Sequence, residues 1–387
     1  MKSTSKSFLY EVIFIVTSVF PLALSMSVCS GMGVFAGMFF SVAAALIAAV
    51  NSSSAMIPVY LVFLTFSAVL GAYNAATLSL SIIISGALLA LSSLFYEKIK
   101  PLFSSPASAG AMLAAALSVT ILFTTDYFGI GASGNNVIQM LASYRSLGFH
   151  ANWRGVLYGT IVMVIMITFP RKFKKLCSAV NASFIAIIVT LVLNLFLNPA
   201  DMPTAINEIG NFSSADFAKD LIFALIGEKP NIFAAVFSGA ALFFPCFYMI
   251  AQSETAEKRS FIIDGAANAA LGFAGCMALP CGLKKDKHTF AVGTAAAAIT
   301  AIMLVCISRL IPRIPVHSCA VVLIVGAWHS VKWREIKNAF SSVFSVLIFA
   351  VSILAFLISG ISSGILVCAA LSALYHLISD KKPVKGS

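Results

Sequence analysis

Three consecutive serines, Ser52, Ser53 and Ser54, follow Asn51 at the predicted start of an apolar helix. Side-chain hydroxyls and the free N–H groups of a helix N-terminus both donate hydrogen bonds, and the helix dipole adds partial positive charge there. These residue types therefore support an anion-binding site. On these residues alone, an N-cap at a membrane surface is the simpler interpretation, because Ser and Asn also favour that position.

A second polar break, PCGLKKDKH at 280–288, interrupts the apolar sequence in the second half of the chain. Pro280, Cys281 and Gly282 stand where the next helix would begin. The three lysines within 284–287 would place positive charge near an anion pathway, or they form a basic cluster at the cytoplasmic surface. Clusters of that kind are common in membrane proteins, so the second interpretation is preferred.

Acidic side chains are scarce in the apolar segments, where Glu11 and Asp264 are the two acids. Each lies near the end of its segment, so we expect both carboxylates to reach the membrane interface. A pump that depends on paired carboxylates in mid-membrane is not expected, whereas an anion pathway needs no such pair.

The eight cysteines form no CxxC pair, and the five histidines show no HxxxH spacing. We therefore expect no metal site and no cofactor. No nucleophile and base stand together in the sequence, so an enzymatic role is not expected either. Glycines on the apolar segments are interpreted as sites of close helix packing.

The composition places the chain in a lipid bilayer. Of its 387 residues, 60% are hydrophobic and 10% are charged, against about a quarter charged in soluble domains. At about 20 residues for each helical crossing, this length leaves no room for a sizeable soluble domain. Soluble enzymes, disordered scaffolds and nucleic-acid-binding proteins are excluded.

Apolar segments separated by charged residues, Pro or Gly predict an all-α polytopic protein with 13–14 transmembrane segments. The ambiguity in number is the short stretch 280–288. The predicted segments cover residues 9–29, 32–50, 55–71, 76–96, 106–124, 153–169, 177–197, 231–250, 260–279, 289–311, 315–330, 339–358 and 361–378.

The net charge of +11 is explained by topology. Cytoplasmic loops of membrane proteins collect Lys and Arg. With the N-terminus in the cytoplasm, all but a few of the 25 basic residues fall in inner loops, which predicts a multi-pass protein of the plasma or inner membrane with both termini inside. The basic residues left outside are Arg145, Arg154, Lys219, Lys229, Arg309 and Arg313.

The two halves of the chain also resemble each other. Pro106 opens an Ala/Gly/Ser-rich segment in the first half, and Pro315 opens a similar one in the second. Two small-residue segments, 33–50 and 262–279, each run into a polar break. Corresponding breaks in two halves are typical of inverted repeats with a binding site at the membrane midplane; the alternative is that apolar helices look alike by chance.

Several stretches spread over the whole chain carry a family resemblance. The most specific is IPVHSCAVVLIVGAWHSVKWREI at 314–336, with its Ile-Pro start and its Ala-Trp before Glu-Ile. It resembles the membrane domain of the SulP (sulfate permease) family, whose members move sulfate, bicarbonate, chloride and related anions. The other stretches are PLALSMSVCSGMGVFAG at 21–37, PASAGAMLAAAL at 106–117, RGVLYGTIVMVIMITFPRKFKKL at 154–176 and DGAANAALGFAG at 264–275.

The resemblance implies 14 segments in two inverted halves of seven, arranged as a core and a gate domain. The anion would lie between the N-termini of the third and tenth segments, and the protein would form a homodimer. The substrate-binding residues implied or predicted are Leu22, Met26, Ser52, Ser53, Ser54, Pro280, Cys281 and Gly282.

The chain departs from the family pattern in several places. The polar break before the third segment is shorter than usual, and the stretch 280–288 lacks the Ser-Arg that the family places beside the anion. Gly239 stands where many bacterial members carry a Glu on the eighth segment, which argues against proton coupling through that acid. We also expect no C-terminal STAS domain after the last segment.

The sequence thus predicts one transmembrane transporter domain over residues 1–379, with repeats at about 1–199 and 220–379 and a short cytoplasmic tail at 380–387. The expected function is secondary transport of a small inorganic anion or a carboxylate by alternating access, as an exchanger or facilitator. A nucleobase transporter of the same fold and a transport-inactive scaffold or accessory subunit stay open as alternatives.

Overall fold

The computed structural model describes residues 2–29, 42, 46, 75–99, 106–130, 137–147, 151–177, 179–197, 229–251, 258–272, 289–307, 310–359 and 361–379. Every element within these ranges is a helix. The all-α fold predicted from the apolar segments is therefore confirmed.

The helix bounds agree closely with the predicted segments, except that the segments 32–50 and 55–71 and the stretch 280–288 lie almost wholly outside the described residues. The first-half helices are α1 (Lys2–Cys29), α4 (Ala75–Ser92), α5 (Tyr96–Ile99), α6 (Pro106–Phe128), α7 (Val137–Leu147), α8 (Trp153–Lys172), α9 (Lys174–Cys177) and α10 (Ala182–Leu197). The second-half helices are α12 (Ile232–Ala251), α13 (Lys258–Gly272), α14 (Thr289–Ile307), the 3₁₀ helix η2 (Ile311–Arg313), α15 (Val316–Ser330), α16 (Trp333–Ala339), α17 (Val343–Ser359) and α18 (Ile361–Ser379).

Three of the described helices are long and apolar enough to cross a membrane by length and composition. These stretches are Phe8–Met26, Pro106–Phe128 and Trp153–Lys172. The remaining apolar helices are somewhat shorter, and many of their large side chains are exposed, as expected of surfaces that face lipid.

Local sequence explains where several helices begin and end. Asn152 is the N-cap of α8, and its Oδ1 accepts a hydrogen bond from the backbone N–H of Gly155 at 3.2 Å. Helix α6 ends before Gly129, whose φ of 67° is in the left-handed region that favours glycine. Pro315 precedes α15 as its N-cap, a position where a missing N–H costs nothing.

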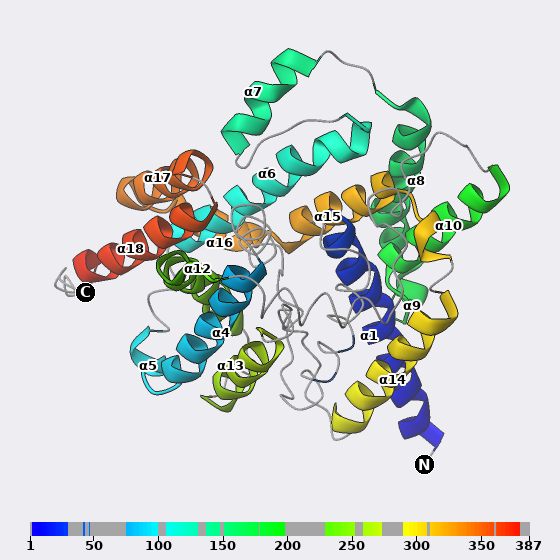
Figure 1. Ribbon diagram of the computed structural model, residues 1–387, viewed down its shortest axis with the longest axis horizontal. Helices are drawn as coiled ribbons and strands as arrows, with labels where there is room; N and C mark the ends of the chain where they lie inside the picture. The colour runs from blue at the N-terminus through cyan, green and yellow to red at the C-terminus, as the bar shows by residue number, and fades with distance from the viewer. Residues whose placement is uncertain are drawn as a thin grey trace.

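Six helices form a continuous layer in the order α10, α8, α15, α6, α17, α18, each packed against the next. In Figure 1, α6 and α15 cross the centre of the view, with α8 and α10 on one side and α17 and α18 on the other. The order is palindromic, because each first-half helix has its second-half counterpart at the mirrored place in the layer. We call this arrangement the six-helix layer.

The same two-fold relation holds for several contacts within and around the six-helix layer, while α1–α15 has no α12–α6 counterpart of similar extent. The pair α6–α17 matches α15–α8, α17–α18 matches α8–α10, and α12–α18 matches α1–α10. Outside the layer, α12–α4 matches α1–α14. Helices α6 and α15 are counterparts of each other, so the pseudo-two-fold axis that relates the two halves passes through their contact. This pattern is the inverted repeat that the two proline-opened segments predicted.

Outside the six-helix layer, α4 packs closely against α12 and α13. A β-carbon added to Gly86 of α4 would lie 2.5 Å from the carbonyl oxygen of Gly265 on α13, and one added to Gly265 would lie 2.6 Å from that of Gly86. The two backbones approach this closely because neither residue has a side chain. The division into the layer and these outer helices corresponds to the expected gate and core domains.

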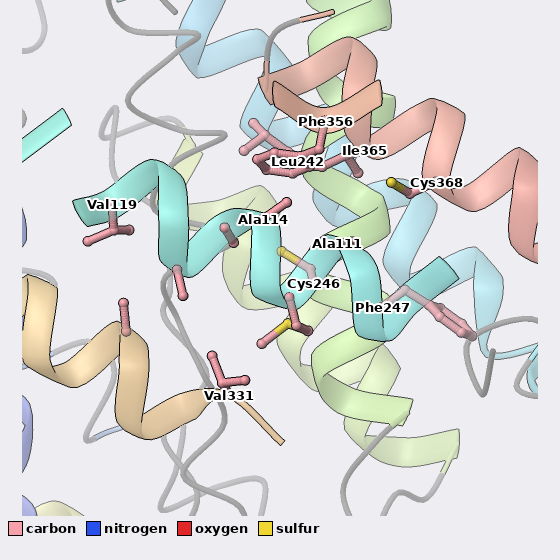
Figure 2. Close-up of a cluster of buried hydrophobic side chains, with 14 of the residues drawn as sticks. Ala111, Ala114, Val119, Leu242, Cys246, Phe247, Val331, Phe356, Ile365 and Cys368 are labelled. Carbon is pink, nitrogen blue, oxygen red and sulfur yellow. The ribbon is translucent and has the colours of Figure 1, made fainter. Parts of the chain in front are cut away.

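The largest apolar cluster lies where α6 meets helices from both groups. Figure 2 shows Ala111 and Ala114 of α6 near Leu242 and Cys246 of α12, with Val119 of the same cluster farther along α6. Gly110 of α6 lets α17 approach closely, because a β-carbon there would lie 2.8 Å from the carbonyl oxygen of Phe349. The cluster also takes in Val331 after α15, and Phe356, Ile365 and Cys368 of α17 and α18.

Short helices complete the ends of the bundle. Helix α7 lies against α6, where the Tyr144 hydroxyl donates a hydrogen bond to the carbonyl oxygen of Ile121 at 2.5 Å. Burial, and then the nearby carboxylate of Asp126, raise the pKa of Tyr144, so this hydroxyl remains a donor at neutral pH.

Candidate functional site

Leu22 and Met26, the predicted apolar walls of the site, lie one turn apart on α1. Met26 is buried with 4% of its surface exposed, and Leu22 is half-buried. Both pack into the apolar cluster that holds Leu242 and Cys246 of α12. The middle of the first segment therefore meets the same apolar cluster as the middle of the eighth, beside α6 and α15.

Three buried hydroxyls stand on the helices that meet here. Ser25 of α1, Ser118 of α6 and Ser318 of α15 are each fully buried, and none makes a regular hydrogen bond within the described structure. The Ser25 hydroxyl lies beside the thiol of Cys319, which is only a weak hydrogen-bonding group. A buried polar group without a partner costs about 1–3 kcal/mol, so these hydroxyls are candidate donors to a ligand.

Ser52, Ser53 and Ser54 lie outside the described residues, as do Pro280, Cys281 and Gly282. The expected meeting of these two helix starts thus stays a prediction. What the structure adds is that α1 packs on α15 and α15 on α6, while α12 packs on α4 and α18.

Gly239, the position aligned with the acid of the eighth segment, packs against α4. A β-carbon there would lie 2.8 Å from Cγ2 of Ile84 and 3.0 Å from the carbonyl oxygen of Ser81. An acid at this position would thus meet α4. The α12 residues in the cluster shared with Met26 are Leu242, Cys246 and Phe247.

The expectation that Asp264 reaches the membrane interface is wrong. Its exposed fraction is 5%, and Asn268, one turn later on α13, is also buried. Asp264 lies close enough to the Cys246 thiol of α12 to act on it electrostatically, and it has polar or charged partners of its own. Helix α13 packs closely against α4, a pairing that sequence position alone does not reveal. Glu11 is half-buried.

A tight contact between α8 and α15 was not predicted. Gly155 and Gly159 on α8 let His317, Tyr127 and Val321 approach the helix backbone. The small-residue spacing in RGVLYGT is the signal that could have identified this contact. Asp126 was also missed, because the predicted segment stopped at residue 124 while α6 continues to Phe128.

Among the described residues, no group of three His, Cys, Asp or Glu side chains could hold a metal ion. The unpaired polar groups in the described part of the chain include the hydroxyls of Ser25, Ser118 and Ser318. Hydroxyls of this kind can donate hydrogen bonds to a small solute.

No protein-family model and no curated protein matches the sequence. Solved structures match it over nearly its whole length. The transmembrane domain of a cyanobacterial bicarbonate transporter, BicA, aligns with a TM-score of 0.69 at 16% identity, covering 95% of this chain and 96% of that one.

Two structures of SLC26A9 align as well. One has a TM-score of 0.64 at 14% identity and covers 97% of this chain and 66% of that one. The other, murine Slc26a9 in the inward-facing state and described as an anion transporter, has a TM-score of 0.66 at 11% identity and covers 96% and 68%. The chain therefore has the polytopic membrane fold of the SulP/SLC26 anion transporters, and the fold expected from the SulP resemblance is confirmed.

Proposed function

We propose that this protein is a secondary transporter of a small inorganic anion, such as sulfate, bicarbonate or chloride, or of a carboxylate. The observation that carries the proposal is the match of the whole chain to the transmembrane domain of a bicarbonate transporter, with 95% and 96% of the two chains covered. The two-fold contact pattern adds support, because alternating access in such folds moves one helix bundle against the other around a fixed site.

The site proposed for the anion lies between the helix start at Ser52, Ser53 and Ser54 and the break at 280–282. Leu22 and Met26 form its apolar walls. The Ser25 hydroxyl, on the same helix and without a strong partner, supplies a donor beside them. Helix starts and hydroxyls are the groups that bind small anions without a charged side chain.

The arrangement in the membrane follows from the distribution of charge. We place both termini in the cytoplasm and the protein in the plasma or inner membrane, because the basic clusters fall in the loops that this orientation puts inside. Residues 1–379 form one transporter domain, with repeats at about 1–199 and 220–379 and the tail 380–387 after it. The protein would work as a homodimer.

Uptake into proteoliposomes tests the proposal. The purified protein, shown to be folded by gel filtration and thermal unfolding, is reconstituted and supplied with labelled sulfate, bicarbonate, chloride or a dicarboxylate. Saturable uptake of one of these, above that of protein-free vesicles, is expected. Uptake of uracil or xanthine instead would select the nucleobase alternative, and no uptake of any solute would select the scaffold alternative.

A further inference from the structure

A single histidine is buried in the contact between α8 and α15, at the end where both helices begin. His317 lies in the first turn of α15 and has no exposed surface. Neither Nδ1 nor Nε2 makes a hydrogen bond within the described structure. Ionisable side chains are rare inside membrane proteins, and one that faces the helix bundle marks a functional site more often than not.

The imidazole fits because two glycines make room for it. A β-carbon added to Gly155 of α8 would lie 2.0 Å from Nε2 of His317, and one added to Gly129 after α6 would lie 2.9 Å from the same nitrogen. The ring thus packs directly on two stretches of backbone. An anion does not fit between them in this conformation, whereas a proton needs no space.

The repeat shows that the fold does not require a histidine here. When Pro106 of α6 is aligned with Pro315 before α15, His317 corresponds to Ser108. Ser108 is a small buried side chain on α6, and the pair α6–α17 is the counterpart of α15–α8. An unpaired imidazole is therefore a feature of the second half, and packing alone does not account for it.

The charges around His317 come from three neighbouring elements. Asp126 on α6 is close enough to act on Cys319, two residues beyond His317, and it is the one acid among these neighbours. Helices α1 and α10 also pack on α15. Cys29 of α1 packs against the apolar cluster that includes Val316 and Cys319 of α15. Helix α10 has no titratable residue. Among the described residues, the other titratable or charged side chains at this end include Tyr127 on α6, Tyr144 on α7, Arg154 and Tyr158 on α8, and Arg313 on η2.

We propose that His317 is the proton-binding site of a proton-linked anion transport cycle, an inference that rests on the proposed function. A neutral imidazole tolerates the dry contact with Gly155. An imidazolium does not, because an unpaired charge buried in apolar surroundings is far more costly than a neutral group. Taking a proton from the adjoining solution therefore favours separation of α15 from α8, which lets water, Asp126 or an entering anion reach the ring.

Proton and anion then assist each other. If protonation favours the separated state and the anion binds that state better, each raises the affinity for the other by the same factor. Acidifying the side on which α8 and α15 begin should speed anion entry from that side. Reclosure of α15 onto Gly155 would release the proton.

The experiment follows anion and proton together in proteoliposomes that contain a pH-sensitive dye. Sulfate and chloride are the probes, because neither buffers near the histidine pKa of about 6.5. For the wild-type protein, an inward proton gradient should raise the initial uptake rate several-fold, and the lumen should acidify as the anion enters. His317→Gln should transport at one rate with and without the gradient. His329→Gln, at an exposed site on the same helix, should respond like wild type.

The outcomes separate this inference from the proposed function. Uptake by the wild type that ignores the gradient, or a full gradient response in His317→Gln, overturns the role of His317 and leaves anion transport intact. Absence of uptake overturns both. If His317→Gln does not fold, the wild type alone decides, because saturable uptake without lumenal acidification contradicts the inference.

Discussion

Trp328 of α15 donates a hydrogen bond from Nε1 to Oγ1 of Thr120 on α6 at 2.8 Å. This bond joins the two helices that lie on the pseudo-two-fold axis, between the first and second halves of the protein. The Trp328 ring also stacks on that of Trp333 in α16, with centroids 6.2 Å apart and an interplanar angle of 11°. The crossing of α6 and α15 is thus held by a specific polar contact as well as by small side chains.

Replacing Thr120 by Val should destabilise this crossing. The change removes the acceptor and leaves a part-buried indole N–H unpaired, at a cost of about 1–3 kcal/mol. The apparent midpoint of thermal unfolding in detergent should fall. Thr124→Val is the matched control, because the hydrogen bond shown for its hydroxyl stays within α6. Equal midpoints for the two variants would show that the Trp328 contact contributes little.

Gly86→Ala should disrupt the contact between α4 and α13. The added methyl group would lie 2.5 Å from the backbone nitrogen of Ala269 and from the carbonyl oxygen of Gly265, and neither backbone atom can rotate away. Overpacking of this kind costs about 1–3 kcal/mol or more. Gel filtration of Gly86→Ala should show a lower yield and a broader elution profile than the wild type. Ala87→Val is the control, because Ala87 is the next residue and is exposed, and it should elute like the wild type. A wild-type profile for Gly86→Ala would mean that the helices can separate without cost.

Ser25→Ala distinguishes a ligand-binding hydroxyl from a structural one. Because the Ser25 hydroxyl has no strong partner in the described structure, removing it should leave the unfolding midpoint unchanged or raise it. The KM for anion uptake should rise by about tenfold if the hydroxyl donates to the anion, since 1.4 kcal/mol corresponds to tenfold in affinity. A lowered midpoint with unchanged KM would assign the residue to packing.

The double variant Ser53→Ala/Ser54→Ala tests the predicted helix start. A hydrogen bond to a charged group contributes about 1.5–3 kcal/mol, so loss of both hydroxyls should raise the KM by at least about tenfold. Ser359→Ala, an exposed serine whose hydroxyl bonds within its own helix, serves as the control. Unchanged transport in the double variant would remove these serines from the site.

The fold could be predicted from the sequence because its determinants are local. Apolar length sets the helices, Pro106 and Pro315 mark equivalent starts, and the basic clusters define the loops. Glycines on the apolar segments indicated close packing, as found for Gly86 and Gly265, but not which helices they bring together. The short helix α7 was not predicted, because an 11-residue segment with mixed polarity carries no membrane signal.

The candidate site could be predicted only in part. Leu22 and Met26 were placed through a family resemblance, and the structure puts them in the cluster that contacts α12. The burial of Asp264, the packing of Gly239 on α4 and the enclosure of His317 depend on which helices become neighbours. Helices of uniformly apolar composition carry no periodic pattern that fixes those pairings in advance.

Anion uptake by the reconstituted wild-type protein tests the central claim most directly. Labelled sulfate, bicarbonate, chloride or a dicarboxylate should enter proteoliposomes in a saturable manner, and unlabelled anion of the same kind should compete. Folded protein that moves none of these anions, in either direction and with or without a pH gradient, would contradict it.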